Sequence, residues 1–191
     1  MGWVHGFHSL DPAVIKELST ASPADLVARV RAKGISPGDV GCESWDEGVD
    51  ENAALTLLAT TREWDVDKDL EGIEQIARLA PSLAAARKLL RQMEDFSASG
   101  LPERFHPAEA GLMGIAMPDA ISAAVAAVEP FAGPEGRRML ATPSSWLNGL
   151  STGRLRKRIE SDDTLWQHWT DLVEAVRWAH SRGEWLGLHL S

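Results

Sequence analysis

The sequence predicts an α+β fold: a helix-rich single domain over residues 1–191, with a small sheet that includes the N- and C-terminal strands. Residues 3–9 alternate with the period of a strand, and the segment 184–190 places its leucines on one side. Between these segments, apolar residues recur mostly with helical spacing. Because a helix-rich middle between two end strands lacks the alternation of a doubly wound sheet, we expect the ends to pair under a cover of helices.

Capping residues and prolines predict the first two helices. Asp11-Pro12 supplies an N-cap and a proline at the first helical position, and Ser22-Pro23 repeats the device. Gly34 is the expected stop of the second helix. Residues 35–51 combine glycine, proline and carboxylates without a clear period, so we expect an acidic loop there.

Apolar stripes predict the remaining helices, with a break at Pro81. The last helix is N-capped by Asp162 or Asp163 and carries an apolar face as far as Ala179. Residues 131–153 are dense in glycine, proline, serine and threonine, so we expect mostly loop. The other stripes are Ala54, Leu55 and Leu58; Leu70, Ile73, Ala77 and Ala80; Leu83, Ala86, Leu90 and Met93; and Ile121, Ala124, Val125 and Val128.

The net charge of the chain indicates which classes of partner to expect. There are 28 acidic residues against 19 Lys and Arg, which gives a formal net charge of −9. Nucleic acids and anionic membranes are bound mainly through Lys and Arg, so we expect neither as a partner. A basic protein partner fits this charge better, and we expect no cofactor.

Composition also predicts a compartment and a source. Cys42 is the sole cysteine, which excludes an intramolecular disulfide and a cysteine-rich zinc site. The opening "MGWVHGFHSLDP" lacks the regions of a signal peptide, and no window is long enough to cross a bilayer. Arg strongly outnumbers Lys, which we interpret as the mark of a GC-rich genome. These features predict a cytoplasmic bacterial protein.

One serine motif raises the question of hydrolase chemistry. Gly149-Leu150-Ser151-Thr152-Gly153 fits the G-x-S-x-G pattern of a nucleophile elbow, where serine occupies a sharp turn between a buried strand and a helix. The residues before it do not read as a strand, and "RLRKRIESDD" after it is too charged for the buried helix. We therefore favour a turn or cap role for Ser151 and keep a hydrolase as the alternative.

The six histidines offer few combinations that suit a metal ion. His5 and His8 are three residues apart, but the strand period places them on opposite faces. His168 and His180 share one predicted helix and lie about 18 Å apart along its axis, too far for one ion. His168 with Asp171, at i and i+3, stays open as a metal-binding pair.

Two further candidates do not meet the requirements of their chemistry. Residues 65–69, Asp-Val-Asp-Lys-Asp, resemble the start of a calcium loop, but Leu70 replaces the turn glycine and Ile76 the bidentate glutamate. We interpret these carboxylates as caps of the helix that begins near Leu70. Cys42 is followed by Glu43 and has no cationic neighbour in sequence to favour a reactive thiolate.

Two charged segments are candidates for partner binding. An aromatic side chain ringed by carboxylates in the acidic loop suits a basic protein. A compact basic run at 154–158 suits an anion or the acidic loop of a second copy. The alternative for both segments is a solvated surface without a partner. The predicted partner-binding residues are Trp45, Asp46, Glu47, Asp50, Glu51, Arg154, Arg156 and Arg158.

Three segments resemble the YfbM-like family of uncharacterised bacterial proteins. They are "MGWVHGFHSLDPAVIKEL", "MPDAISAAVAAV" and "LWQHWTDLVEAVRWAHSRGEWLGLHL". These are similar to the family's Met-Gly start with its first strand and helix, its Pro-initiated late helix, and its closing helix, glycine turn and strand. The family's early Asp-Lys-x-x-Trp helix is not reproduced in "VDENAALTLLATT". The resemblance implies an α+β fold and a cytoplasmic bacterial protein, and it brings no established activity.

Acidity and small size together favour a protein-binding or interaction module, for example an immunity-type antagonist of a basic partner. The alternative is an enzyme, either a hydrolase that uses Ser151 or one that uses a metal held by His168 and Asp171.

Overall fold

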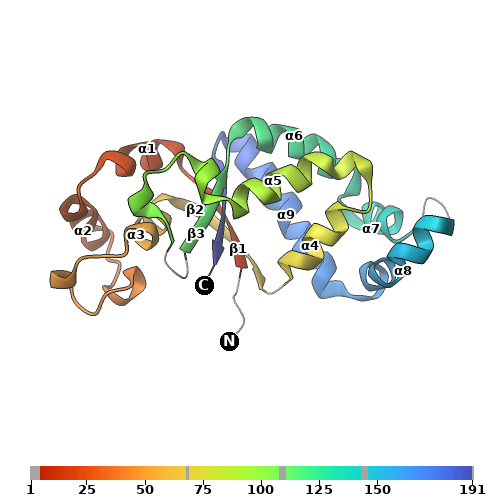
Figure 1. Ribbon diagram of the computed structural model, residues 1–191, viewed down its shortest axis with the longest axis horizontal. Helices are drawn as coiled ribbons and strands as arrows, with labels where there is room; N and C mark the ends of the chain where they lie inside the picture. The colour runs from red at the N-terminus through yellow and green to blue at the C-terminus, as the bar shows by residue number, and fades with distance from the viewer. Residues whose placement is uncertain (1–4, 68, 108–110, 143–145, 191) are drawn as a thin grey trace.

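The computed structural model describes residues 5–67, 69–107, 111–142 and 146–190, and it has the predicted α+β fold (Figure 1). Within these residues, one antiparallel sheet has the strand order β2-β1-β4-β3. The strands are β1 (His5–Leu10), β2 (Thr60–Asp67), β3 (Gly111–Ala116) and β4 (Trp185–Leu190).

The first and last strands lie side by side in the centre of the sheet, which confirms the predicted pairing. β1 runs antiparallel to β4, with Phe7 opposite Leu188 and Leu10 opposite Trp185. β2 pairs with the other edge of β1, and β3 pairs with the other edge of β4. The strand expected from residue 3 is described from His5 onward.

Helices cover both faces of the sheet (Figure 1). They are α1 (Pro12–Thr20), α2 (Pro23–Ala32), α3 (Glu51–Ala59), α4 (Leu70–Ala77), α5 (Ala84–Glu94), α6 (Pro118–Val128), α7 (Gly133–Ala141), α8 (Trp146–Ser161) and α9 (Asp163–Arg182). The acidic loop holds two 3-10 turns, η1 (Gly38–Val40) and η2 (Trp45–Glu47). No helix in the described ranges combines the length and apolar character needed to span a bilayer.

The predicted capping residues form the helix ends. Asp11 accepts hydrogen bonds from two backbone amides at the start of α1, and Ser22 forms a capping box at the start of α2. Asp162 caps α9. Gly183 ends α9 with a φ of 67°, the left-handed conformation that glycine adopts without strain.

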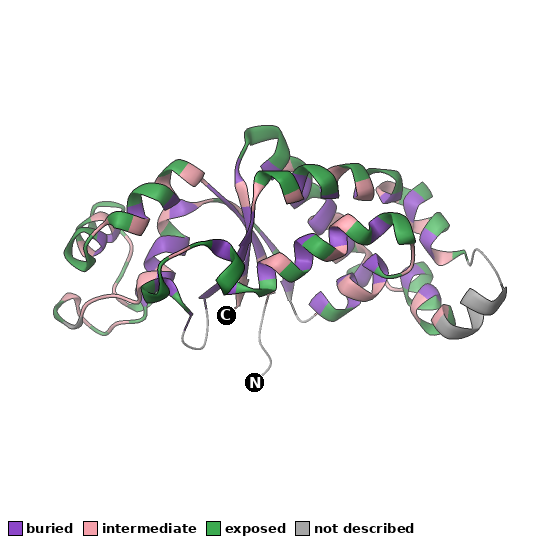
Figure 2. Ribbon diagram, turned by 45° about the horizontal axis from the view of Figure 1, so that its top comes forward, coloured by how far each residue is buried: buried purple, intermediate pink, exposed green. Residues whose placement is uncertain are grey.

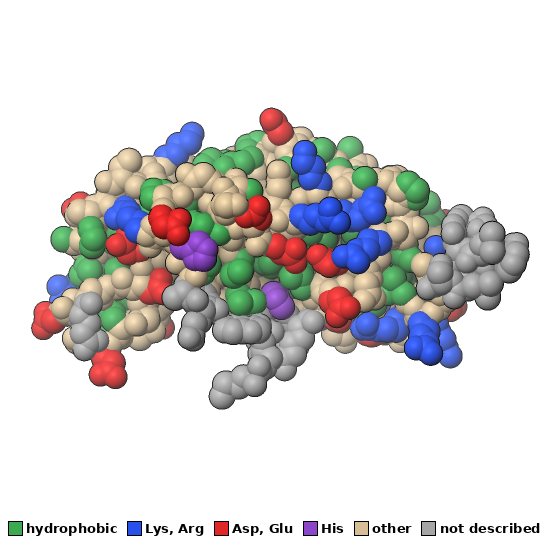
Figure 3. All heavy atoms as spheres, viewed as in Figure 1, with side chains coloured by type: hydrophobic (Ala, Val, Ile, Leu, Met, Phe, Trp, Pro, Cys, Tyr) green, Lys and Arg blue, Asp and Glu red, His purple; other side chains and the backbone are tan. Residues whose placement is uncertain are grey.

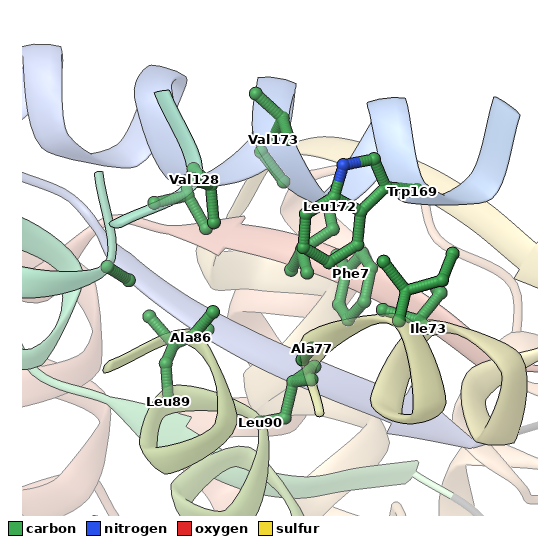
Figure 4. Close-up of a cluster of buried hydrophobic side chains, with 14 of the residues drawn as sticks. Phe7, Ile73, Ala77, Ala86, Leu89, Leu90, Val128, Trp169, Leu172 and Val173 are labelled. Atoms are coloured by element: carbon green, nitrogen blue, oxygen red, sulfur yellow. The ribbon is translucent and has the colours of Figure 1, made fainter. Parts of the chain in front are cut away.

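The larger hydrophobic core lies between the sheet and α4, α5, α6 and α9 (Figure 4). Trp169 of α9 is fully buried in this core together with Phe7 of β1, and its Nε1 donates to the carbonyl oxygen of Phe131 at 3.1 Å. On the other sheet face, Leu10 and Leu112 pack into a second core with α1 and α3. Figure 2 shows this division, with buried residues along the strands and on the inward sides of the helices.

Residues 131–153 differ from the prediction, because they contain α7 and the first half of α8 where mostly loop was expected. Arg156 supplies the reason. Its buried guanidinium donates to the carbonyl oxygens of Leu140 and Thr142 at the end of α7. These polar bonds join the two helices in addition to the buried Leu140 of α7 and Ile159 of α8. Residue periodicity does not reveal the polar contact.

The edge strands β2 and β3 also go beyond the prediction. β2 follows α3 directly, without an intervening loop, and its sequence is rich in charged residues. β3 is a short apolar segment with Gly114 inside it, and its pairing with β4 is interrupted between Leu112 and Gly114. β3 lacks the alternation that predicts a strand, whereas residues 63–67 of β2 do alternate, with Trp64 and Val66 buried, a signal that the prediction did not use.

A buried carboxylate joins three strands and α9 at one end of the sheet. Glu184, which is 7% exposed, lies between α9 and β4. Its Oε2 accepts hydrogen bonds from Ser9 Oγ of β1 at 2.6 Å, Thr61 Oγ1 of β2 at 2.8 Å and Trp178 Nε1 of α9 at 3.2 Å. Arg182 Nε donates to Oε1 at 2.8 Å. Burial raises the pKa of this carboxyl, but the hydrogen bonds outweigh burial and hold its pKa below the ordinary value.

Replacement of this carboxylate should destabilise the fold. We expect Glu184→Ala to lower the free energy of unfolding by about 2–4 kcal/mol, because it leaves buried donors without their acceptor. Denaturant unfolding measures this change. The matched control is Glu135→Ala on α7, whose carboxylate is 66% exposed and pairs with an exposed arginine, and it should cost no more than about 0.5 kcal/mol. Equal losses in the two variants would contradict the structural role of Glu184.

Candidate functional site

A pocket of about 560 Å³ opens at the end of the sheet opposite Glu184. Residues of β1, β2 and β4 form one side of it, and residues of α3 and η1 form the other. Its volume falls within the range of small-molecule sites, roughly 300–1,000 Å³. We name it the histidine pocket, and its titratable side chains are His5, His8, His189, Asp39, Glu63 and Asp65.

The pairing of the two central strands brings two of these histidines together. His189 lies opposite Gly6 in the register of β1 and β4. The rings of His8 and His189 are consequently in contact, with centroids 5.0 Å apart and planes inclined by 45°. Gly6 leaves room for this arrangement, since a Cβ there would lie 3.3 Å from His8 Nε2 and 3.3 Å from the carbonyl oxygen of Trp64.

A threonine connects His8 to the helix side of the pocket. His8 is 9% exposed, and its Nδ1 lies 3.1 Å from Thr60 Oγ1 at the start of β2. The same hydroxyl donates to the carbonyl oxygen of Thr56 on α3 at 2.7 Å. Because α3 runs directly into β2, the bond from Thr60 to Thr56 is local in sequence, whereas the contact between His8 and Thr60 joins β1 to β2.

The two ring systems are predominantly uncharged at neutral pH. Burial, and then the nearby His189, lowers the pKa of His8 to about 4. Burial also lowers the pKa of His189, against the opposing effect of Glu63. A neutral imidazole offers one N–H donor and one lone pair. These two rings therefore contribute hydrogen-bonding groups to the pocket rather than positive charge.

Carboxylates dominate the charge of the pocket. Glu63 and Asp65 of β2 and Asp39 of η1 are exposed residues of its lining. Asp39 also accepts hydrogen bonds from the amide and hydroxyl of Ser36, which hold its pKa below the ordinary value. No Lys or Arg is among the described residues that line the pocket. The pocket is therefore an anionic surface at neutral pH.

Cationic side chains gather elsewhere on the molecule. In the view of Figure 3, Lys and Arg concentrate over α4 and α5, where Arg78, Arg87 and Arg91 surround a shallow depression with Glu74. These helices pack on the sheet face opposite α3. The negative charge of the histidine pocket is therefore not offset by this cationic surface.

Among the described side chains, no group of three or more His, Cys, Asp or Glu is placed to hold a metal ion. His5 and His8 nevertheless line the same pocket, whereas the strand period predicts opposite faces. The register between β1 and β2 shifts between His5 and Gly6. Such a bulge redirects a side chain, which accounts for the difference.

The pair predicted to hold a metal on α9 has other partners. His168 Nδ1 lies 3.5 Å from Asp69 Oδ2, and Asp171 accepts a hydrogen bond from Gln167 at 2.9 Å. Asp69 was expected to cap α4 through its carboxylate, but it makes no such hydrogen bond and pairs with Arg158 at 3.4 Å. Among the described residues, His168 and Asp171 do not belong to a group of three or more side chains that could hold a metal ion.

Several residues of the predicted acidic surface stabilise the loop itself. Trp45 is half-buried, with the guanidinium of Arg31 5.2 Å above its ring. Asp50 caps α3 by accepting a hydrogen bond from a backbone amide at 3.0 Å. Glu51 pairs with Arg104 at 2.9 Å, and both side chains are mostly buried. Substitution of these residues would therefore test the fold as much as a binding surface.

Asp46 is the exposed member of this predicted set, and the side chain of Glu47 lies outside the described residues. The basic run is similarly divided. Arg154 is exposed, Arg156 is 7% exposed against α7, and Arg158 is engaged with Asp162 at 3.2 Å. Arg156 thus faces the interior rather than a partner, and partner binding by Asp46 and Arg154 stays a prediction.

Ser151 lies within α8, with helical residues on both sides. A nucleophile elbow requires a strand, a sharp turn and then a helix, and the backbone at Ser151 does not have this form. The expected turn or cap role is not met either, because this position is internal to the helix. The side chain of Ser151 is outside the described part of the structure.

Comparison with protein-family models, with curated proteins and with solved structures gives no match to this chain. The resemblance to the YfbM-like family accordingly stays a prediction. Fold and site together define an acidic α+β protein with a pocket of histidines and carboxylates.

The titration of His8 is directly measurable. We expect its NMR titration midpoint near pH 4, far below the ordinary value of 6.5. Between these two pH values the unfolded chain binds a proton that the folded chain does not. The free energy of unfolding should therefore fall by up to about 3 kcal/mol as the pH drops through this window. A midpoint near 6.5 would contradict the buried position of the ring.

Proposed function

We propose that this protein is a binding module that captures a basic partner by taking one of its Lys or Arg side chains into the histidine pocket. The observation that carries the proposal is the lining of the pocket. Three carboxylates, Asp39, Glu63 and Asp65, contribute to it, and no Lys or Arg is found among its described residues. An immunity-type antagonist of a basic protein would be one module of this kind.

The position of Glu63 supports recognition of a cation. Glu63 is exposed on β2 and raises the pKa of His189 against the effect of burial, so its carboxylate interacts electrostatically with one ring of the pocket lining. An exposed ion pair contributes only about 0.2–1 kcal/mol. Several carboxylates around one cation, together with uncharged acceptors, make a stronger site than one pair alone.

The shape of the pocket also suits one long side chain. Ala53 and Leu57 of α3 give its helix side an apolar character, and Leu57 is 37% exposed. The methylene stem of Lys or Arg can pack on such a surface while its charged end reaches the carboxylates. We regard the pocket as a receptor for the tip of a larger partner, rather than as a catalytic centre.

Blocked pentapeptides with a central Lys, Arg or Gln, titrated into the ¹⁵N-labelled protein, test this proposal. We expect the Lys and Arg peptides to shift amide signals of β1, β2 and β4 around the pocket, and the Gln peptide to leave them unchanged. Glu63→Gln should weaken binding of the charged peptides by about 2- to 5-fold, the effect of one exposed ion pair. Added salt should reduce this difference.

Glu135→Gln is the matched control, since it removes the same charge from α7, outside the pocket. It should leave peptide affinity unchanged. The proposal fails if the Gln peptide binds as well as the charged ones, or if none of the peptides shifts signals at the pocket.

A further inference from the structure

We propose that the histidine pocket selects cations that carry an N–H group, because His8 Nε2 accepts a hydrogen bond from the bound cation. The pocket would then take the ammonium group of Lys or the guanidinium of Arg and discriminate against a fully alkylated ammonium. This inference rests on the proposed function and specifies the chemistry of the same site.

The first step concerns the single proton of the Thr60 hydroxyl. Thr60 Oγ1 lies 2.7 Å from the carbonyl oxygen of Thr56, and a carbonyl oxygen can only accept. The hydroxyl proton is therefore directed to Thr56. Thr60 Oγ1 is left to accept at its second contact, which is His8 Nδ1 at 3.1 Å. Nδ1 must then carry the ring proton.

The second step follows from the charge of the ring. An uncharged imidazole with its proton on Nδ1 has a lone pair on Nε2. His8 is uncharged at neutral pH because burial, and then His189, lowers its pKa to about 4. Thr60 is thus a positioning residue, which fixes the tautomer of His8 through Nδ1 and makes Nε2 an acceptor.

The third step is the location of that acceptor. His8 is nine-tenths buried, and Nε2 lies on the side of Gly6, another residue of the lining. The hydrogen bond that His8 makes to Thr60 uses Nδ1 rather than Nε2. An acceptor that lines the pocket can receive a hydrogen bond from a ligand N–H, so a ligand that donates to it gains over one that only brings charge.

Lysine methylation separates hydrogen-bond donation from charge and size. The peptide with central Lys is compared with the same peptide carrying Nε-dimethyllysine or Nε-trimethyllysine. All three keep a positive charge at neutral pH. The dimethyl form has nearly the bulk of the trimethyl form but retains one N–H. We expect the Lys and dimethyl peptides to bind about 3- to 10-fold more tightly than the trimethyl peptide, the effect of one hydrogen bond.

Two variants of Thr60 test the positioning step. Thr60→Val keeps the shape of the side chain but removes the hydroxyl. The ratio of the affinities for the dimethyl and trimethyl peptides should then fall toward 1. Thr60→Ser restores the hydroxyl and should retain the preference. In the wild-type protein, long-range ¹H–¹⁵N spectra of the His8 ring should show a protonated Nδ1 and an unprotonated Nε2, a readout that does not depend on the folding of any variant.

The outcomes separate the two proposals. Equal binding of the Lys and trimethyl peptides would overturn the N–H preference, while the proposed function as a pocket for cations would stand. A drop in affinity already at the dimethyl form would assign the discrimination to size and likewise overturn it. A proton on His8 Nε2 would overturn it independently of affinity. If no cationic peptide binds, the proposed function fails, and the inference fails with it.

Discussion

Four hydrogen bonds converge on the carboxylate of Glu184, and they join segments that are distant in the sequence. Ser9 donates from β1, Thr61 donates from β2, and Trp178 donates from the last turns of α9. The guanidinium of Arg62 lies over the ring of Trp178 at 4.6 Å, which adds a cation–π contact beside the carboxylate. The register of the central strands and the docking of α9 both depend on this buried, fully engaged group.

The pocket lies at the other end of the same strands, where the buried amide of Asn52 on α3 is hydrogen-bonded to the backbone of Leu112 on β3. There the sheet carries a register shift between His5 and Gly6, a glycine without a side chain, and histidines in mutual contact. Irregular pairing of this kind is common beside binding sites, because it redirects side chains away from the regular pleat. One end of the sheet thus holds a buried carboxylate network, and the other holds a pocket lined by histidines and carboxylates.

Much of the fold could be predicted because local signals agree with it. Asp11-Pro12, Ser22-Pro23 and the long apolar face of α9 each specify an element by cap, proline or periodicity. α7 and α8 could not be predicted, since Arg156 joins them through a contact that no short-range pattern encodes. The candidate site could be predicted from the sequence only in part. Pairing of β1 with β4 implies that His8 and His189 approach each other, and the alternation of residues 63–67 could have placed Glu63 on a strand. The bulge between His5 and Gly6 has no signature in the sequence.

The strand order has a consequence for synthesis of the chain. β1 and β2 are made early and can pair as a hairpin-like unit across α1, α2 and α3. The other edge of β1 is reserved for β4, the last of the four strands to leave the ribosome. Until then, a central strand exposes unpaired backbone groups, which favours association with other extended chains. The nascent chain therefore depends on the synthesis of β4, or on a chaperone, to close the sheet.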